Sequence, residues 1–469
     1  MQFWKSSKKK VMVIGLDSAP PELIFNQWLD KLPNIRALIQ GGAHGPLRSC
    51  DPPITVPAWS SMMSSKNPGK LGIYGFRNRA DHSYDKLSIA TSAAIKEDRV
   101  WDILSRAGKN VILIGVPQTY PPPKELHGHM VTCFLTPDTD CQYTHPPAFK
   151  YEIKQVVGEY ILDVKNFRSE QKDETLAQIH DMTRKRFKLA RHLLKKEAWD
   201  FFMMVEMGVD RIQHAFWKYM DKTHRKFVPG NPYENAIFDY YQYVDREIGE
   251  LLSFADRNTT VFVVSDHGAQ KMEGGICINE WMMQNGYLTL SQKPSALTPF
   301  SGAKVDWPKT RAWGEGGYYS RIFMNVKGRE PQGVIEPAQY EAERDRLIEK
   351  IEAITDDQGK PIGTRAHRPE QLYPVTHGIA PDLIVYFGNL AWRSVGSVGL
   401  GTLHTFENDT GPDDANHAQH GIFVMHRSGE RYPDPLQGLH LMDMAPTILR
   451  IMGLPVPSDM EGRVVSVVR

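Results

Sequence analysis

Short apolar runs alternate along this chain with longer amphipathic stretches. The runs are rich in β-branched residues and are continuous, without polar residues at every second position. They span residues 11–16, 111–116, 201–205, 260–264, 383–387 and 422–425. Continuous hydrophobicity is typical of strands buried on both faces, as in a parallel sheet covered by helices. We therefore predict an α/β fold with a central, mostly parallel sheet flanked by helices.

Two amphipathic stretches of the chain predict helices that cover this sheet. Apolar residues recur at three- and four-residue spacing over residues 176–194 and 237–251, which is the period of one helix face. A last helix is expected near residues 442–452, because Gly453 and Pro455 follow it as stop signals.

Residues 282–377 differ from the rest in their pattern. They contain Pro and Gly clusters, an alternating segment at 318–326 and one helical stretch at 337–354. We interpret them as an inserted, smaller α+β subdomain. The metal-binding catalytic core is then predicted to comprise residues 8–281 and 378–469.

Composition and charge narrow the range of partners and locations. The 469 residues are 41% hydrophobic and 24% charged, and the net charge is +1. Such a charge provides no general field for a nucleic acid polymer, so none is expected as a partner. Four scattered cysteines and the lack of a long apolar run predict no disulfide scaffold and no transmembrane segment. A cytoplasmic protein is the expectation.

Acidic residues and histidines follow or precede several of the predicted strands. They are Asp17, Asp210 with His214, Asp266 with His267, and His417 or His420. The carboxyl ends of parallel strands meet at one edge of a sheet, so these side chains should converge. Clustered carboxylates are tolerated mainly around divalent cations. We predict a site for two divalent ions, with zinc as the first choice and manganese as the alternative.

Each of these residues also has a purely structural interpretation. Asp17 could be the N-cap of a helix, and Asp210 could simply form a hydrogen bond to His214 one helical turn away. The dipeptide Asp266-His267 is more specific, because two ionisable groups at a buried strand end cost free energy without a partner. The joint occurrence of all of them favours the metal site.

A nucleophile is expected in the hydroxyl-rich stretch that contains Thr55. Thr55 precedes Val56-Pro57 and begins a predicted helix, where backbone N–H groups and the helix dipole stabilise an alkoxide. The alternatives are a plain N-capping role for Thr55, and Ser60 or Ser61 as the nucleophile.

Taken together, the motifs resemble the alkaline phosphatase superfamily and, within it, the type I phosphodiesterase and nucleotide pyrophosphatase family. The resemblance rests on Asp17, 55–60 (TVPAWS), 67–73 (NPGKLGI), Asp210 with His214, 266–268 (DHG) and His417, and on segments 322–329, 380–384 and 443–447. These pieces keep their order over nearly the whole chain. The resemblance implies a central sheet with helices around it and two divalent ions.

The resemblance also implies a role for each matching residue. Asp17, Thr55, Asp266 and His267 would surround one ion, and Asp210, His214 and His417 would hold the other. Thr55 would attack phosphorus and form a phosphothreonine intermediate. The implied substrate is a small phosphate ester or a nucleotide.

The chain departs from the family at the expected phosphate contact. Nucleotide pyrophosphatases usually carry His-Gly-Ile where this chain has Leu71-Gly72-Ile73, and an Asn where it has Phe76; Asn78 lies close by. We take Asn78, Phe76 and Trp59 as candidate substrate-binding residues. Packing in the core is the alternative for the two aromatic side chains.

The function predicted first is a phosphodiesterase or nucleotide pyrophosphatase. A phosphomonoesterase and a phosphomutase on the same core are the alternatives. A sulfatase is excluded, since Thr55 does not begin the required C/S-x-P-x-R motif and Trp59 stands at its Arg position. From another class, the chain could be a catalytically silent metal-binding scaffold.

Overall fold

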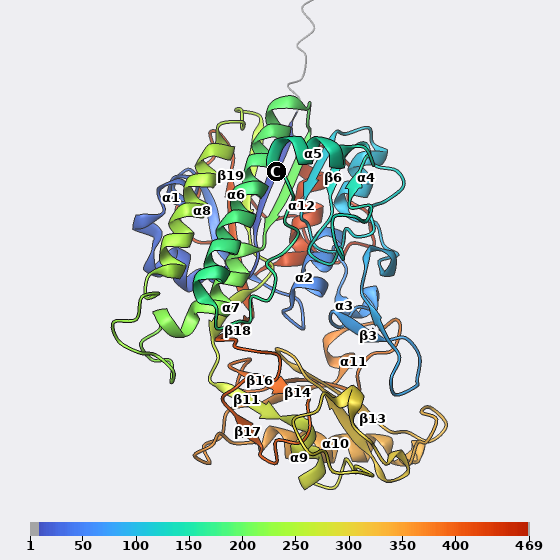
Figure 1. Cartoon of the computed structure of the whole chain (residues 1–469). Helices are drawn as coiled ribbons and strands as arrows, with labels where there is room; N and C mark the ends of the chain where they lie inside the picture. Colours follow the sequence, from blue (N-terminus) through green and yellow to red (C-terminus); the bar gives the residue numbers. More distant parts are fainter. Residues whose placement is uncertain (1–8, 468–469) are drawn as a thin grey trace, which may run out of the picture.

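The central sheet lies in the upper part of the molecule in Figure 1, a computed structural model that describes residues 9–467. Within these residues the sheet has nine strands. Their order across the sheet is β20 (Leu439–His440), β2 (Gly42–Arg48), β19 (His420–His426), β9 (Thr259–Val264), β1 (Lys10–Leu16), β8 (Phe201–Glu206), β5 (Val111–Ile114), β6 (Gly128–Val131) and β7 (Thr144–His145). The predicted limits of the core at residues 8 and 469 lie outside the described residues.

Most strand pairs of this sheet are parallel, which confirms the prediction. β1 pairs in parallel with β8 and β9, and β8 and β6 pair in parallel with β5. β19 is antiparallel to both β9 and β2. The register places Leu16 opposite Glu206, and Gly15 opposite Val264. The carboxyl ends of β1, β8 and β9 therefore coincide at one edge of the sheet.

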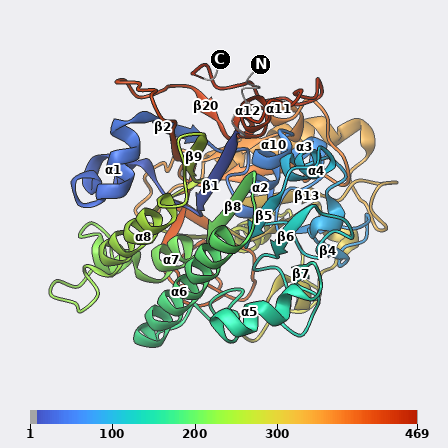
Figure 2. The same ribbon diagram turned by 90° about the horizontal axis from the view of Figure 1, so that it is seen from above.

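Helices cover both faces of the central sheet, as Figure 2 shows from above. Met12 and Ile14 of β1 pack into one core, and Val11 and Val13 pack into the other. The first core includes α1 (Pro33–Gln40), α5 (Phe149–Val157), α6 (Lys172–Lys196), α7 (Gly208–Met220) and α8 (Ala236–Leu252). The second includes α2 (Thr55–Ser64), α4 (Val100–Arg106) and α12 (Met444–Ile451). Burial on both faces explains why the strand sequences are continuously apolar.

A smaller unit lies below the central sheet in Figure 1. One of its sheets has the order β12 (Ala312–Glu315), β13 (Ser320–Met324), β15 (Leu383–Tyr386) and β14 (Arg365–His367), all antiparallel. The other joins β16 (Trp392–Val395), β11 (Gly274–Cys277) and β17 (His404–Thr405). Its helices are α9 (Ile278–Gln284), α10 (Tyr340–Glu352) and α11 (Pro369–Leu372).

The apolar run at 383–387 is not part of the central sheet, contrary to the expectation from its sequence. It forms β15, a middle strand of the smaller antiparallel sheet. Its run is continuous because Leu383 and Val385 pack into one hydrophobic cluster, and Ile384 and Tyr386 pack into another. The boundaries of the insert at 282 and 377 stay a prediction. The strand pairing favours a wider insert, from β11 to β17.

The predicted helices are present as α6, α8, α10 and α12. Among residues 9–467, none of the helices combines the length and the apolar character needed to cross a bilayer.

Candidate metal centre and nucleophile

Six of the acidic and histidine residues singled out in the sequence lie together in two groups. We call Asp17, Asp266 and His267 the Asp17 group, and Asp210, His214 and His417 the Asp210 group. In each group the candidate ligand atoms lie within 4.8 Å of one another. All six residues are at most 2% exposed. The structure therefore brings residues from four distant segments into one buried centre.

The sheet edge and one helix position these side chains. Asp17 directly follows β1, and Asp266 and His267 follow β9. Asp210 and His214 lie one turn apart on α7, which follows β8. His417 lies on β18 (Ala415–Ala418), which pairs with β10 (Gly268–Lys271) so that His417 is opposite Ala269.

The two groups adjoin each other, and Thr55 lies beside one of them. The rings of His267 and His417 stack, with centroids 3.9 Å apart and an interplanar angle of 19°. Thr55 is the first residue of α2. Its Oγ1 lies 3.5 Å from Oδ1 of Asp17 and 3.4 Å from Nε2 of His267. The hydroxyl of Thr55 is thus within reach of a cation bound by the Asp17 group.

The three histidines are held in one orientation by acceptors at Nδ1. Nδ1 of His267 lies 3.0 Å from the carbonyl oxygen of Gly268, and Nδ1 of His214 lies 2.7 Å from Oδ1 of Asp413. Nδ1 of His417 lies 2.9 Å from a backbone carbonyl oxygen. A proton on Nδ1 leaves the Nε2 lone pair free for a metal. The Nε2 atoms of His214 and His417 face each other at 3.3 Å.

Each group contains one buried carboxylate oxygen that makes no hydrogen bond to any of residues 9–467. These atoms are Oδ1 of Asp210 and Oδ2 of Asp266. They lie 3.1 Å from Nε2 of His214 and 3.2 Å from Nε2 of His267, respectively. A buried carboxylate oxygen beside a histidine Nε2 is costly unless a proton or a divalent cation lies between the two atoms. Mixed Asp and His donors fit zinc or a similar divalent ion in each group.

The charges of the centre also favour cations. Burial raises the pKa of Asp17 to about 8, and the charge of Asp210 acts in the same direction. Burial and the charge of Asp17 raise the pKa of Asp266 well above its usual range. Burial lowers the pKa of His267 to about 4, so this imidazole is neutral at pH 7. A divalent cation offsets the repulsion between carboxylates crowded in this way.

Two supporting residues were not found by sequence reasoning. Asp413 pairs with His214. Arg211 donates Nη1 to Asp210, and Nε and Nη2 to Asp163 at 2.9 and 2.7 Å. The signal for Asp413 was an acidic pair shortly before the strand of His417. Arg211 directly follows a predicted ligand.

Trp59 contacts the Asp17 group and does not line an open surface. Its Nε1 donates to Oδ2 of Asp17 at 2.7 Å, and the side chain is 1% exposed in the second core. This placement favours the packed-aromatic alternative for Trp59.

The other two candidate substrate-binding residues lie near the nucleophile helix. Phe76 is half-buried, and its ring centroid lies 5.9 Å from that of Phe134. The amide of Asn78 accepts the N–H of Tyr74 at 2.8 Å and donates to the carbonyl of Gly75 at 3.1 Å. Both ends of the Asn78 side chain therefore close a local turn.

The competing histidine and hydroxyls are placed differently from His417 and Thr55. His420 is exposed on β19 opposite Arg48, whereas His417 is buried in the Asp210 group. Ser60 donates its hydroxyl to the carbonyl oxygen of Val56 inside α2. Ser61 is buried in the interior of α2. These placements favour His417 as a ligand and Thr55 as the nucleophile.

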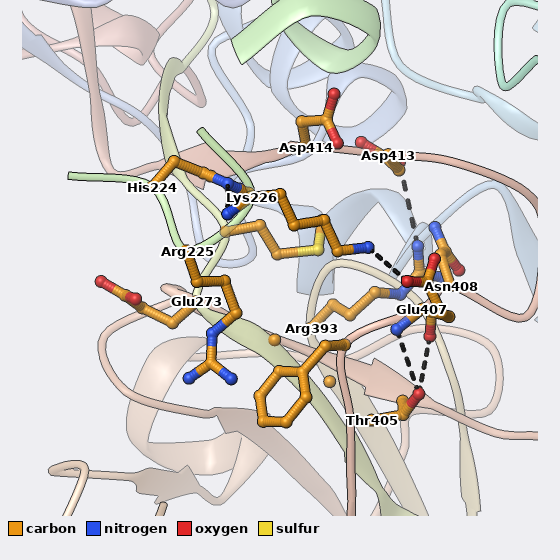
Figure 3. Close-up of a pocket in the computed structure, with 14 residues that line it drawn as sticks. His224, Arg225, Lys226, Glu273, Arg393, Thr405, Glu407, Asn408, Asp413 and Asp414 are labelled. Carbon is orange, nitrogen blue, oxygen red and sulfur yellow. Dashed lines mark hydrogen bonds and ion pairs between the residues drawn. The ribbon is translucent and has the colours of Figure 1, made fainter. Parts of the chain in front are cut away.

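A separate pocket borders Asp413, the residue that pairs with His214 (Figure 3). Asp413 and Asp414 line it, together with Arg393 of β16, His224 and Glu407. Arg393 is 5% exposed, and its Nη1 lies 3.8 Å from Oδ2 of Asp413. The pocket therefore borders Asp413, which supports the Asp210 group, and it lies next to the two ligand groups and Thr55.

Comparisons with known proteins agree with the fold. The chain has the fold of human ectonucleotide pyrophosphatase/phosphodiesterase 5, with a TM-score of 0.55, 12% identity and 96% of each chain covered. An inactive form of the murine protein, solved in complex with AMP, has a TM-score of 0.56 at 12% identity over 96% of both chains. Phosphonoacetate hydrolase from Sinorhizobium meliloti, in complex with phosphonoformate, has a TM-score of 0.58 at 14% identity over 93% of this chain and 94% of its own.

At these identities the solved structures establish the fold alone. A search of curated proteins returned no match. The model of the type I phosphodiesterase/nucleotide pyrophosphatase family matches residues 11–413, which include Thr55 and five of the six residues in the two groups. The chain therefore belongs to the type I phosphodiesterase/nucleotide pyrophosphatase family of phosphoric ester hydrolases.

Proposed function

We propose that the protein hydrolyses a phosphodiester or a nucleotide pyrophosphate bond, with Thr55 as the nucleophile and two divalent ions, zinc in preference to manganese, as cofactors. The observation that carries this proposal is that the Thr55 hydroxyl lies beside the Asp17 group, which adjoins the Asp210 group through the stacked rings of His267 and His417. When bound, two such ions lower the pKa of a coordinated hydroxyl and neutralise the charge that develops on phosphoryl oxygens.

Thr55 would react in two steps. First, its Oγ1 forms a bond to phosphorus while the bond from phosphorus to the leaving ester oxygen breaks. The leaving oxygen keeps the bonding electron pair and takes up a proton, and the hydroxyl proton of Thr55 passes to solvent. Water then cleaves the Oγ1–P bond of the phosphothreonine and releases the phosphate product. The start of α2 assists both steps, because its unpaired N–H groups and its dipole attract the anionic phosphoryl group.

A row of aromatic side chains supports a diester as the substrate. We call Phe76, Phe134 and Phe167 the aromatic row. Phe76 and Phe134 pack beside Val56, the neighbour of Thr55. The guanidinium of Arg211 lies over Phe134 and Phe167 at 5.6 and 4.5 Å, and Phe167 lies 6.2 Å from His214. Such a row from the nucleophile to the Asp210 group offers apolar contact to the second ester group.

The alternatives make different use of the same centre. A phosphomonoesterase needs no contact for a second ester group, and a phosphomutase returns the phosphoryl group to another hydroxyl of its substrate. A catalytically silent scaffold would bind the ions without turnover.

The four cysteines are free thiols, which supports the proposal of a cytoplasmic location.

The test compares rates on bis(p-nitrophenyl) phosphate, p-nitrophenyl phosphate and ATP in the presence of zinc or manganese. We expect the diester or ATP to react fastest. A strong preference for the monoester would support the phosphomonoesterase instead.

Variants of Thr55 test the nucleophile. Thr55→Ala should lower the rate at least about 10³-fold, whereas Thr55→Ser, which keeps a hydroxyl, should retain part of it. Mass spectrometry of the acid-quenched parent enzyme should show a phosphoryl group on the peptide that contains Thr55. Undiminished turnover by Thr55→Ala would remove Thr55 from the reaction.

A further inference from the structure

Tyr318 reaches the metal centre from the smaller unit. It lies in the turn between β12 and β13. Its ring stacks on His417 with a centroid distance of 4.2 Å and an interplanar angle of 26°, and on His214 at 4.8 Å and 22°. The tyrosine ring therefore covers two histidines of the Asp210 group at once.

The hydroxyl of Tyr318 acts on the same group through Asp413. It donates to Oδ2 of Asp413 at 3.1 Å, and Nε of Arg168 donates to the same oxygen at 2.8 Å. The other carboxylate oxygen of Asp413 lies 2.7 Å from Nδ1 of His214. Both oxygens of Asp413 are thus fixed, and a fixed carboxylate sets the tautomer and the ring orientation of a metal-binding histidine.

The backbone of the turn holds Tyr318 in this place. The N–H of Gly317 donates to the carbonyl of Ser394 at 2.8 Å, and the N–H of Ser394 donates back at 2.9 Å. The side chain of Asn416, the neighbour of His417, donates to the carbonyl of Tyr318 at 3.1 Å. A Cβ on Gly316 would lie 2.4 Å from the backbone nitrogen of Gly396. The close approach of the two glycine backbones allows the turn to reach the histidines.

We propose that Tyr318 is a positioning residue that sets the affinity of the Asp210 group for its divalent ion. Its ring holds His214 and His417 in place, and its hydroxyl fixes Asp413 behind His214. This makes one residue of the smaller unit a determinant of metal binding in the catalytic core. The inference rests on the two-ion centre of the proposed function.

The test is a titration of the metal-free full chain with zinc in competition with a chromophoric chelator, which resolves the affinities of two sites. Tyr318→Phe removes the hydroxyl and keeps the ring, and Tyr318→Leu removes both. Tyr319→Phe is the matched control. It removes a buried hydroxyl of the same turn, one that donates to the carbonyl of Tyr74.

We expect Tyr318→Phe to weaken zinc binding at one site about 10-fold and Tyr318→Leu to weaken it further, up to about 100-fold. The second site should keep its affinity in both variants. Tyr319→Phe should bind both ions as the parent does. Asp413→Asn should weaken the same site as Tyr318→Phe, which connects the effect to His214. Thermal unfolding of each metal-free variant separates a loss of affinity from a loss of folding.

Two results would overturn the inference while the proposed function stands. One is parental affinity at both sites in Tyr318→Phe and Tyr318→Leu. The other is an equal loss at both sites, or an equal loss in Tyr319→Phe, because the effect would then be general. If the parent chain itself binds no zinc or manganese, the two-ion proposal fails and the inference fails with it.

Discussion

Nδ1 of His417 lies 2.9 Å from the carbonyl oxygen of Pro53, two residues before Thr55. This hydrogen bond connects a late strand of the chain to the segment that carries the nucleophile. His417 also stacks on His267. A single imidazole therefore links the Asp210 group, the Asp17 group and the start of α2, so the positions of the two ions and of the Thr55 hydroxyl depend on one another.

Asp266 should stabilise the fold when the ions are bound and should destabilise it when they are removed. Burial and the charge of Asp17 raise the pKa of Asp266, so its ionisation opposes folding when no cation offsets it. In the presence of EDTA, Asp266→Asn should be at least as stable as the parent. With zinc at 100 times its dissociation constant, the parent should gain about 2.7 kcal/mol per site, and the variant should gain less. Thermal unfolding in both buffers measures this, and a variant less stable than the parent in EDTA contradicts the account.

The indole of Trp59 should contribute both to stability and to ion affinity. Trp59→Phe keeps an aromatic ring in the core but loses the hydrogen bond from Nε1 to Asp17. With zinc bound and Asp17 ionised, we expect a loss of about 1.5–3 kcal/mol in the free energy of unfolding, as for other hydrogen bonds to charged groups. We also expect about 10-fold weaker zinc binding at one site.

Trp101→Phe is the control for this change. Trp101 lies in the same core, and its buried Nε1 has no hydrogen-bond partner within the described part of the chain. The substitution should leave both zinc affinities unchanged and cost less stability than Trp59→Phe. If the two substitutions changed the free energy of unfolding and the zinc affinity equally, the hydrogen bond from Trp59 to Asp17 would contribute nothing beyond the packing of the ring.

The aromatic row should matter for diesters more than for monoesters. Phe134→Leu removes an aromatic contact with Phe76 and keeps an apolar side chain. We expect kcat/KM on bis(p-nitrophenyl) phosphate to fall about 3- to 10-fold, the range for one aromatic contact, with little change on p-nitrophenyl phosphate. Phe25→Leu, at a partly buried ring packed against His44, is the control. An equal loss of kcat/KM on both substrates would show that Phe134 supports the fold and does not contact the second ester group.

The free energy of unfolding should fall in acid because His224 takes up a proton. His224 lines the pocket of Figure 3. Burial lowers the pKa of His224 to about 4, whereas an unfolded chain has an ordinary imidazole pKa near ~6.5. The stabilisation from keeping His224 neutral is complete above about pH 6.5 and is lost as the pH falls to about 4, an amount on the order of 3 kcal/mol.

His224→Asn should therefore lose less stability than the parent between pH 7 and pH 4.5, as urea unfolding at each pH would measure. Asn keeps an acceptor for the N–H of Lys226, which lies 3.1 Å from Nδ1 of His224. His127→Asn, at an exposed imidazole, is the matched control. Parallel profiles for the parent and His224→Asn would show that His224 does not titrate in this range.

The sequence by itself determined five strands of the central sheet, β1, β5, β8, β9 and β19, and where they end. Continuous apolar runs require burial on both faces, and β1, β8 and β9 fulfil this in parallel register. Residues just past such strands must meet at one edge. For this reason Asp17, Asp210 and Asp266 could be proposed together from their positions alone.

Only the tertiary structure decided the contacts made across long stretches of chain. The position of His417 and His420 before one strand leaves them as competing ligands, and only the family resemblance favours His417. The pairing of β18 with β10 places His417 in the centre, whereas His420 is exposed. The run that forms β15 is as apolar as β1, since two hydrophobic clusters in the smaller unit can cover a strand as completely as two layers of helices.

For the same reason, the pattern of apolar and polar residues could not identify Tyr318 and Asp413 as supporting residues. They lie 95 positions apart, and their hydrogen bond depends on how two units of the fold meet. Helix and strand periodicity describes neighbours within one element, whereas a contact between elements far apart in the chain is fixed only when the packed structure brings their surfaces together.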